Sequence, residues 1–456
     1  MIKTKKKFVT HNVIPPIILI FFSVILFFTL PVFFNYNDIE KKIEKKFDSE
    51  FKLNLKILDK ISQKTFPSPY LLIKKGNLNF IDNDQKTSKI EFKDLKIFTS
   101  HKNIYSRSSI YMKRLEIEDV NFKLKYQDIK NFRDHIYYRI NKPIQIKNSK
   151  FFYLDKFNKT ILISPIYKLD YFINTKNNSK ELKIKGNIFD VNYESFWKRN
   201  YNNPNESFNE IKFKNPNITI KNNFKFENSS NFSGTSLINI LNENINIKYV
   251  KSSDKIFITS PIENINQKIK ILAAIELNPF YFDSEISFED KNFKFIINNL
   301  FNYIMNLNNN SLGNLNGQLL LKFKNIDNEI INQGEIKIII DEKNLEISKS
   351  IFEINEVGEI SSEFNYYEKE GELIFNSKNV FLINNTKNLA RKFQINPKKT
   401  RGLKKIYFDL NKNIETGQIS ITNINFNEKN PEEENKKTYI IKNIQNLKSA
   451  LKKILT

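Results

Sequence analysis

Residues Leu115 to Tyr126 read LEIEDVNFKLKY, and this short stretch indicates the fold class. Its apolar residues alternate with polar or charged ones, for example at Leu115, Ile117, Phe122 and Leu124. Side chains point to opposite faces of a β-strand with a period of two, so the stretch predicts strands with one buried face. The same alternation recurs along the chain at Leu53 and Leu55, Leu78 and Phe80, Ile218 and Ile220, Leu319 and Leu321, Ile336 and Ile338, Phe364 and Tyr366, Ile406 and Phe408, and Ile419 and Ile421.

Helical signals are sparse among these expected strands, and the best short candidates are Asn298 to Asn306 and Asn388 to Phe393. A parallel α/β fold needs a helix between successive strands, so a mainly antiparallel arrangement is favoured. Closed sandwiches would also bury one face of each strand. Residues 61–430 contain no Gly/Pro/Ser-rich linker or composition shift, and we therefore expect one elongated, curved, largely antiparallel sheet there.

An apolar segment precedes this region. No charged residue occurs between Lys7 and Asp38, and residues 13–34 form an uncharged run of about 33 Å if helical, enough to cross a bilayer core. Four lysines in the basic N-terminus, residues 1–12, predict that this end is cytoplasmic and that the rest of the chain lies across the membrane. A cleavable signal peptide is the alternative, but no small-residue cleavage site follows the run.

Two further segments show a helical period. Residues 35–60 carry Ile39, Ile43, Phe47 and Phe51 at helical spacing, which predicts a short amphipathic stalk leaving the membrane. Residues 431–456 begin with acidic residues and then repeat isoleucine and leucine every three to four positions, which predicts a C-terminal amphipathic helix. That helix could cap the open end of the sheet or dock on an anionic membrane or partner.

Composition excludes several classes of function. The chain has no cysteine and three histidines, so no disulfide or thiolate site, and no His-cluster metal site, is expected. It has only 10 glycines and no phosphate-binding glycine motif. The net charge of +23 comes almost entirely from lysine, which lacks the bidentate contacts of arginine, and we expect no nucleic-acid partner.

Two clusters of polar and aromatic residues are candidate sites. The glutamates between Glu356 and Glu372 could supply an acid/base pair, but a solvated sheet face is the favoured interpretation. The basic and aromatic residues around Trp197 could meet headgroup phosphates, although a loop anchor is favoured. We expect no catalytic residue and no cofactor, and hence no enzyme.

Both ends of the chain resemble a known family. The segment FPSPY at Phe66 to Tyr70, the strand LLIKKGNLNF that follows it, and the step at Leu115 to Leu124 together resemble the N-terminal region of AsmA-like proteins of Gram-negative envelopes. Residues Phe393 to Ile424 resemble the C-terminal portion of an alphaproteobacterial branch of the same family. The resemblance implies a single-pass protein of the bacterial inner membrane whose periplasmic β-groove shelters phospholipid acyl chains, in outer-membrane biogenesis or lipid homeostasis.

The expected partners follow from this resemblance: phospholipid, the inner membrane through residues 13–34, and outer-membrane or envelope proteins. The candidate groove lining consists of apolar residues on two successive strands: Leu315, Leu319, Leu321, Phe323, Ile336, Ile338 and Ile340. Ordinary core packing against a second sheet is the alternative for each of them. A periplasmic scaffold or assembly factor that binds envelope proteins without transporting lipid is the alternative function.

Overall fold

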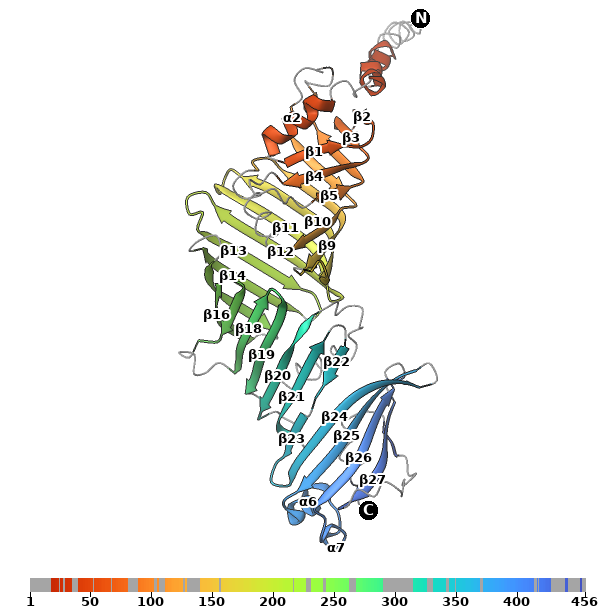
Figure 1. Cartoon of the computed structure of the whole chain (residues 1–456), viewed down its shortest axis with the longest axis vertical. Coiled ribbons are helices and arrows are strands. Elements are labelled where there is room, and N and C mark those ends of the chain that lie inside the picture. Colours follow the sequence, from red (N-terminus) through yellow and green to blue (C-terminus); the bar gives the residue numbers. More distant parts are fainter. Residues whose placement is uncertain are drawn as a thin grey trace, which may run out of the picture. The chain divides into compact units, whose positions relative to one another are not determined.

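The computed structural model divides the chain into two compact units, Met1–Lys225 and Phe226–Thr456. In the described part of the chain, each unit consists mainly of β-strands (Figure 1). The residues that the structure describes are 18–23, 25–27, 29–34, 40–51, 53–66, 68–80, 89–101, 105, 111–125, 128, 140–155, 157–215, 217–226, 231–240, 243–261, 268–289, 315–325, 331–341, 344–348, 350–369, 372–413, 416, 418–427, 439–441 and 452.

The first unit contains a small sheet and a large one. Helix α2 (Glu40–Phe51) leads into the small antiparallel sheet, whose order is β1 (Leu53–Ile57), β4 (Gly76–Phe80) and β5 (Lys89–Phe92). The large sheet runs in pairing order through β2 (Ile61–Lys64), β3 (Tyr70–Ile73), β6 (Asp94–Phe98), β7 (Arg114–Glu118), β9 (Ile144–Leu154), β10 (Thr160–Asn174), β11 (Ser179–Ile188), β12 (Val191–Asn200), β13 (Glu206–Phe213) and β14 (Ile218–Phe226).

One strand of this large sheet is interrupted. Strands β7 and β8 (Asn121–Lys125) both pair in parallel with β9, one after the other in a single register. Between them Asp119 has a φ of 54°, and Asn148 on β9 has a φ of 47°. Both residue types tolerate the left-handed region, so the two strands can kink together without losing their pairing. The Ser149 hydroxyl supports the kink by accepting from the Val120 N–H at 3.1 Å.

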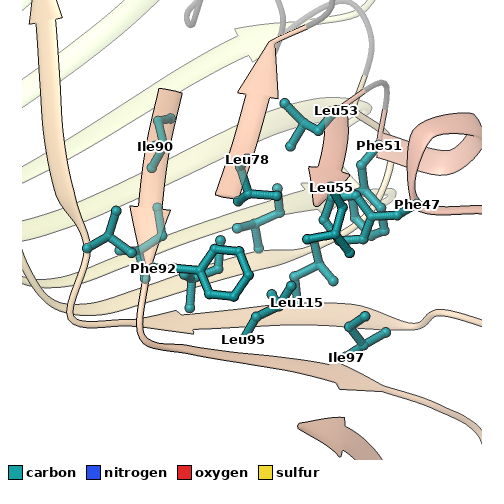
Figure 2. Close-up of a cluster of buried hydrophobic side chains, with 14 of the residues drawn as sticks. Phe47, Phe51, Leu53, Leu55, Leu78, Ile90, Phe92, Leu95, Ile97 and Leu115 are labelled. Carbon is teal, nitrogen blue, oxygen red and sulfur yellow. The ribbon is translucent and has the colours of Figure 1, made fainter. Parts of the chain in front are cut away.

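The core of the first unit lies between these two sheets (Figure 2). Ile43, Phe47 and Phe51 lie along one side of α2 and are fully buried among strand residues such as Leu55 and Leu95. The helix expected within residues 35–60 is therefore present from Glu40 to Phe51, but it is not a free stalk. Its apolar side packs into the core, and the chain after Phe51 forms β1 of the small sheet.

The second unit is built on another mostly antiparallel run of strands. In chain order these are β15 (Phe232–Ile240), β16 (Glu243–Ser252), β17 (Lys255–Thr259), β18 (Ile269–Leu277), β19 (Phe280–Glu289), β20 (Asn316–Lys324), β21 (Ile331–Asp341), β22 (Asn344–Ile347), β23 (Ser350–Ile354), β24 (Gly358–Lys369), β25 (Glu372–Ile383), β26 (Lys405–Asn413), β27 (Ile419–Phe426) and β28 (Tyr439–Ile441). Neighbours pair antiparallel except β19 and β20, which are parallel, while β22 and β23 both pair with β21. The mainly β, largely antiparallel fold class is thus confirmed.

Two short helices pack on the last strands of this unit. Helix α6 (Thr386–Phe393), close to the helix expected from Asn388 to Phe393, is followed by α7 (Pro397–Thr400). Leu389 and Phe393 of α6 are buried in a cluster with Ile360, Phe381 and Ile406 of the sheet. Helix α6 therefore packs on the strands at this end of the unit (Figure 1).

The C-terminal stretch differs from the expectation of a continuous helix over residues 431–456. Tyr439–Ile441 forms β28, which pairs antiparallel with β27. The aromatic and β-branched residues of this tripeptide suit a strand, and the edge of β27 offers free backbone groups to pair with. Lys452 is helical, and the other residues after Ile441 lie outside the described part, as does the candidate helix Asn298 to Asn306.

The apolar N-terminal segment is described only in part. Residues 18–23, 25–27 and 29 are helical, and a 3-10 helix, η1 (Leu30–Phe33), follows. None of the helices in the described part of the chain combines the length and hydropathy that a bilayer crossing requires.

Candidate functional site

The expected groove residues of the second unit lie in two neighbouring rows, one on each of two paired strands. Strands β20 and β21 pair antiparallel with Leu319 opposite Ile338 and Leu321 opposite Ile336. Because directly opposed residues lie on the same side of a sheet, these four side chains share one face. Gly317 opposite Ile340, and Phe323 opposite Gly334, extend the two rows on that side. We call it the apolar face of the second unit.

The apolar face continues onto the strands before β20. The parallel register of β19 places Ile286 beside Leu321 and Phe288 beside Phe323. Further along, Ile271 of β18 lies opposite Ile286, so the rows cross four strands. The cluster that contains these residues also takes in Ile245 and Ile247 of β16, Ile258 of β17, and Phe364 and Phe375 of β24 and β25. One continuous apolar cluster therefore follows the face from β16 to β25.

Burial divides the seven expected lining residues into two groups. Leu315, Leu321, Phe323, Ile336 and Ile338 are buried, with 2% to 9% of each residue exposed. Leu319 and Ile340 are half-buried, as are Ile258, Ile271 and Ile286 on the neighbouring strands. The first group packs as a core does, whereas the second keeps apolar surface that further apolar contacts can cover.

The residues one position away provide a natural comparison. Leu320 and Ile339 are also half-buried, but they alternate with Leu319 and Ile340 and so lie on the opposite face. On that face Lys322 pairs with Glu285 of β19 at 2.8 Å. Both faces of β20 and β21 carry half-buried leucine and isoleucine. The opposite face also carries the ion pair between Lys322 and Glu285, so the two faces differ in charge.

In the first unit, polar side chains form a line across strands β12, β13 and β14. Asn209 of β13 donates from Nδ2 to the Ser195 hydroxyl of β12 at 2.9 Å, and Asn222 of β14 donates to Asn209 Oδ1 at 2.9 Å. All three residues are buried. They share a face with Trp197, which lies opposite Asn209 and stacks on Phe224 with 5.5 Å between ring centroids. This face is therefore mixed, with its buried amides bonded to one another.

Two buried cations lie next to this line. Lys180 of β11 is directly opposite Arg199 of β12, and Arg199 is opposite Ser207 of β13. The Lys180 ammonium donates to the Ile140 carbonyl at 2.9 Å, and Arg199 Nε donates to the Pro204 carbonyl at 2.5 Å. Burial, followed by the charge of Arg199, lowers the pKa of Lys180. The aromatic and basic group around Trp197 thus lies on strands, and Arg199 is bonded to the following turn.

The acidic residues between Glu356 and Glu372 do not form a described cluster. Glu356 lies after β23 and pairs with Arg391 of α6 at 3.1 Å, and Asn388 of the same helix donates to the Glu356 carbonyl at 3.1 Å. These contacts attach α6 to the sheet. Within the described residues, no group of histidine, aspartate or glutamate side chains is arranged to hold a metal ion.

Comparisons with known proteins find no match: neither a family model nor a curated protein resembles the chain closely enough to be reported.

Sequence reasoning missed part of the apolar face and all of the polar line. Ile245, Ile247 and Tyr249 alternate with Asn246 and Lys248, so the period of two could have added β16 to the expected lining. The line from Ser195 to Asn222 has no such signal. Asparagine and serine are common in turns, and only the register of β12, β13 and β14 places these residues side by side.

Proposed function

We propose that the chain is a membrane-anchored protein whose apolar face shelters phospholipid acyl chains. The observation that carries the proposal is the pair of cross-strand rows on β20 and β21, continued onto β18 and β19 and containing half-buried leucine and isoleucine. The role needs no nucleophile, acid or base, because moving a phospholipid breaks no covalent bond. No catalytic residue or cofactor is part of the proposal.

The energetics favour such a surface. Exposing acyl chains to water costs about 0.8 kcal/mol per CH₂ group, so a continuous apolar face lowers the barrier to moving a lipid. Half-buried side chains suit transient contact, because they offer apolar area without a packed core having to open. Leu319 and Ile340 are such residues, and the buried side chains of Ile338 and Leu321 on the same face hold the two strands together.

The membrane anchor in this proposal is the apolar run of residues 13–34. Its support is the absence of charge in the run and the lysines before it. Among its described residues, Leu19, Phe21 and Phe22 each leave 62% to 70% of their surface exposed, which suits contact with lipid. We propose a cytoplasmic N-terminus, with most of the chain in the periplasm of a bacterial envelope.

The resemblance to AsmA-like proteins supplies the biological setting of the proposal. It rests on the segment Phe66 to Tyr70, the step at Leu115 to Leu124 and the stretch Phe393 to Ile424. In this setting the protein would take part in outer-membrane biogenesis or lipid homeostasis, with envelope proteins as further partners.

Matched substitutions on the two faces of β20 and β21 test the lipid role. We would purify the full chain in mild detergent and measure bound phospholipid by native mass spectrometry, for Leu319→Asn and Ile340→Asn against Leu320→Asn and Ile339→Asn. An unpaired amide facing an acyl chain costs about 1–3 kcal/mol, so the first pair should lose phospholipid about fivefold or more. The second pair should bind as the wild type does.

The same four variants supply the control and the outcomes that would contradict the lipid role. Only variants whose circular dichroism and protease resistance match the wild type are compared, because a buried amide can also unfold a strand. Equal phospholipid in all four folded variants would show that β20 and β21 do not contact the bound lipid. Wild-type protein that carries no phospholipid would replace the lipid role with the scaffold role.

One observation favours the scaffold alternative. On the opposite face of the second unit, Val250 of β16 and Phe257 of β17 are directly opposed and 52% and 48% exposed. Leu272 of β18, opposite Thr259, is 59% exposed. Exposed apolar residues gathered on neighbouring strands are typical of protein-binding surfaces. If lipid is absent, this surface is where an envelope protein would bind.

A further inference from the structure

A tyrosine of the first unit is bonded to the apolar N-terminal segment. Tyr105 lies between β6 and β7, and its hydroxyl donates to the Phe27 carbonyl at 2.6 Å. Its ring centroid lies 5.1 Å from that of Phe27 and 6.0 Å from that of Phe34. The folded unit therefore begins to contact the apolar segment seven residues before the end of the uncharged run at Phe34.

The last residues of that run already belong to the folded unit. Pro31 of η1 is buried, and η1 lies against β2. Phe34 packs on the core cluster of the first unit. What remains for the hydrocarbon is residues 13–29, about 25 Å as a helix, which is close to the shortest length that crosses a bilayer core of about 30 Å. The contact between Tyr105 and Phe27 then lies within two residues of the outer boundary of the hydrocarbon.

Exposed aromatic side chains gather at the same end of the large sheet. The register puts Lys64 beside Tyr70, Tyr70 beside Phe98, and Phe98 beside Arg114, so the loops after β2 and between β6 and β7 share one end. These loops carry Phe66, Tyr105 and Tyr111, which are 81%, 40% and 51% exposed. Phe33 of η1, which lies against β2, is 83% exposed.

Charge at this end suits the same surroundings. Lys64, Lys113 and Arg114 are exposed. Lys64 is two residues before Phe66, Lys113 is two residues after Tyr111, and Arg114 is the first residue of β7, opposite Phe98. Tyrosine is enriched at the boundary between hydrocarbon and water, exposed phenylalanine is stabilised by contact with hydrocarbon, and lysine and arginine there attract anionic headgroups.

We propose that Phe33, Phe66, Tyr105 and Tyr111 form an aromatic collar that docks the first unit on the interfacial zone of the bilayer. The proposal rests on the proposed membrane anchor and goes beyond it, since an anchor alone leaves the folded unit free of the surface. The collar fixes which end of the large sheet meets the membrane. It also compensates for the short span, because aromatic side chains fill the interfacial depth that a span of 17 residues leaves uncovered.

The chain contains no cysteine, so single-cysteine variants give unambiguous labelling. We would label Phe66→Cys, Tyr111→Cys, Ile20→Cys and Phe157→Cys with one environment-sensitive fluorophore and place the full chain in phosphatidylcholine and phosphatidylglycerol nanodiscs. Lipids carrying a nitroxide at the headgroup or deep in the acyl chain then quench the label by depth. Phe157 is the matched control: it is 75% exposed, close to the 81% of Phe66, and follows β9, which begins beside Leu115 and runs about 35 Å away from the collar end.

The collar predicts that headgroup nitroxide quenches labels at 66 and 111 at least threefold more than the label at 157. The deep nitroxide should quench the label at 20. If labels at 66 and 111 are quenched no more than the label at 157 while the label at 20 is quenched by the deep probe, the collar is wrong and the anchor stands. A label at 20 that the deep probe does not reach overturns the anchor, and the collar with it.

Discussion

Glu116 shows how one residue links three strands of the first unit. It lies on β7 with 5% of its surface exposed, and its carboxylate pairs with Lys96 of β6 at 2.9 Å and Lys147 of β9 at 3.1 Å. Burial raises the pKa of Glu116, but hydrogen bonds from Lys96 and Lys147 outweigh burial and hold the pKa below its usual value of 4.5. The charged form is therefore favoured by folding.

This arrangement predicts a pH-dependent contribution to stability. A depressed folded-state pKa stabilises the protein above the ordinary pKa of 4.5, and the contribution disappears as the pH falls through the folded-state value. Glu116→Gln should lower the free energy of unfolding by about 1–3 kcal/mol at pH 7. At pH 3, below the ordinary pKa of 4.5, the gap to the wild type should narrow, because the unfolded wild-type chain then takes up a proton that the folded state resists. Denaturant unfolding at pH 7 and pH 3 measures the difference in unfolding free energy between the wild type and Glu116→Gln. A difference of the same size at pH 3 would show that the charge of Glu116 does not cause it.

Gly334 is required where two aromatic rings meet on the apolar face. A Cβ atom at this position would lie 2.7 Å from the Ile351 carbonyl oxygen, 2.8 Å from the Phe323 ring and 3.0 Å from the Phe352 ring. The centroids of those rings lie 6.2 Å apart, and Phe352 packs against the cluster that contains Phe323 and Ile336. A side chain here must displace backbone as well as a ring.

We therefore expect Gly334→Ala to destabilise the chain by about 1–3 kcal/mol, as overpacking does. Gly402 is the control. Nothing lies within 4 Å of its would-be Cβ, although its φ of 83° favours glycine, so Gly402→Asn tests loss of glycine without a steric clash and should cost less. Thermal unfolding of both variants measures the loss of stability. An equal loss in Gly334→Ala and Gly402→Asn would show that a steric clash is not the cause.

Among the helices, α6 begins at a side-chain cap. Asn385 precedes the helix, and its side-chain oxygen accepts from the N–H groups of Lys387 at 3.1 Å and Asn388 at 3.0 Å. The helix is only 8 residues long, so its packing through Leu389 and Phe393 must supply most of its stability.

Asn385→Ala should cost about 1 kcal/mol, whereas Asn385→Asp should be close to neutral because aspartate also caps helices. Hydrogen exchange of the α6 amides would show faster opening in the alanine variant alone. Unchanged exchange in Asn385→Ala would mean that the cap does not hold the helix.

The sequence was informative about elements wherever one period dominates a stretch. The alternation at Leu319 and Leu321 and at Ile336 and Ile338 predicts two strands with a shared apolar side, and the structure confirms both. It could not predict that these rows are directly opposed, because register depends on turns and neighbouring strands. The parallel pairs β7 with β9 and β19 with β20 are likewise invisible to a period of two.

The helical period correctly predicted helix α2, but it did not predict what the apolar side of the helix packs against. Ile43, Phe47 and Phe51 predict an amphipathic helix, yet their spacing does not reveal whether that apolar side meets lipid, water or protein. The structure places it in the core beneath β1 and β4, because residues 53 to 80 fold back as the small sheet. The same limit applied to residues 431–456, where Tyr439–Ile441 pairs with β27 instead.

For the whole molecule, the net charge of +23 says little about a partner. Many of its lysines serve the sheet itself through cross-strand pairs such as Lys255 with Glu276 at 2.6 Å and Lys185 with Glu194 at 3.1 Å. The features that point to function are instead the uncharged run of residues 13–34 and the one-sided apolar face of the second unit. Together they are the basis of our proposal that the chain meets lipid at two places.

Photo-crosslinking in living cells would show whether the apolar face of the second unit contacts phospholipid. A benzophenone amino acid would be placed in the full chain at 319 and 340 on the apolar face, and at 320 and 339 on the opposite face, one variant at a time. Covalently attached phospholipid would then be measured by mass spectrometry of the purified protein. Our account predicts phospholipid adducts at 319 and 340 and few or none at 320 and 339. Equal labelling at all four positions, or adducts only at 320 and 339, would contradict it.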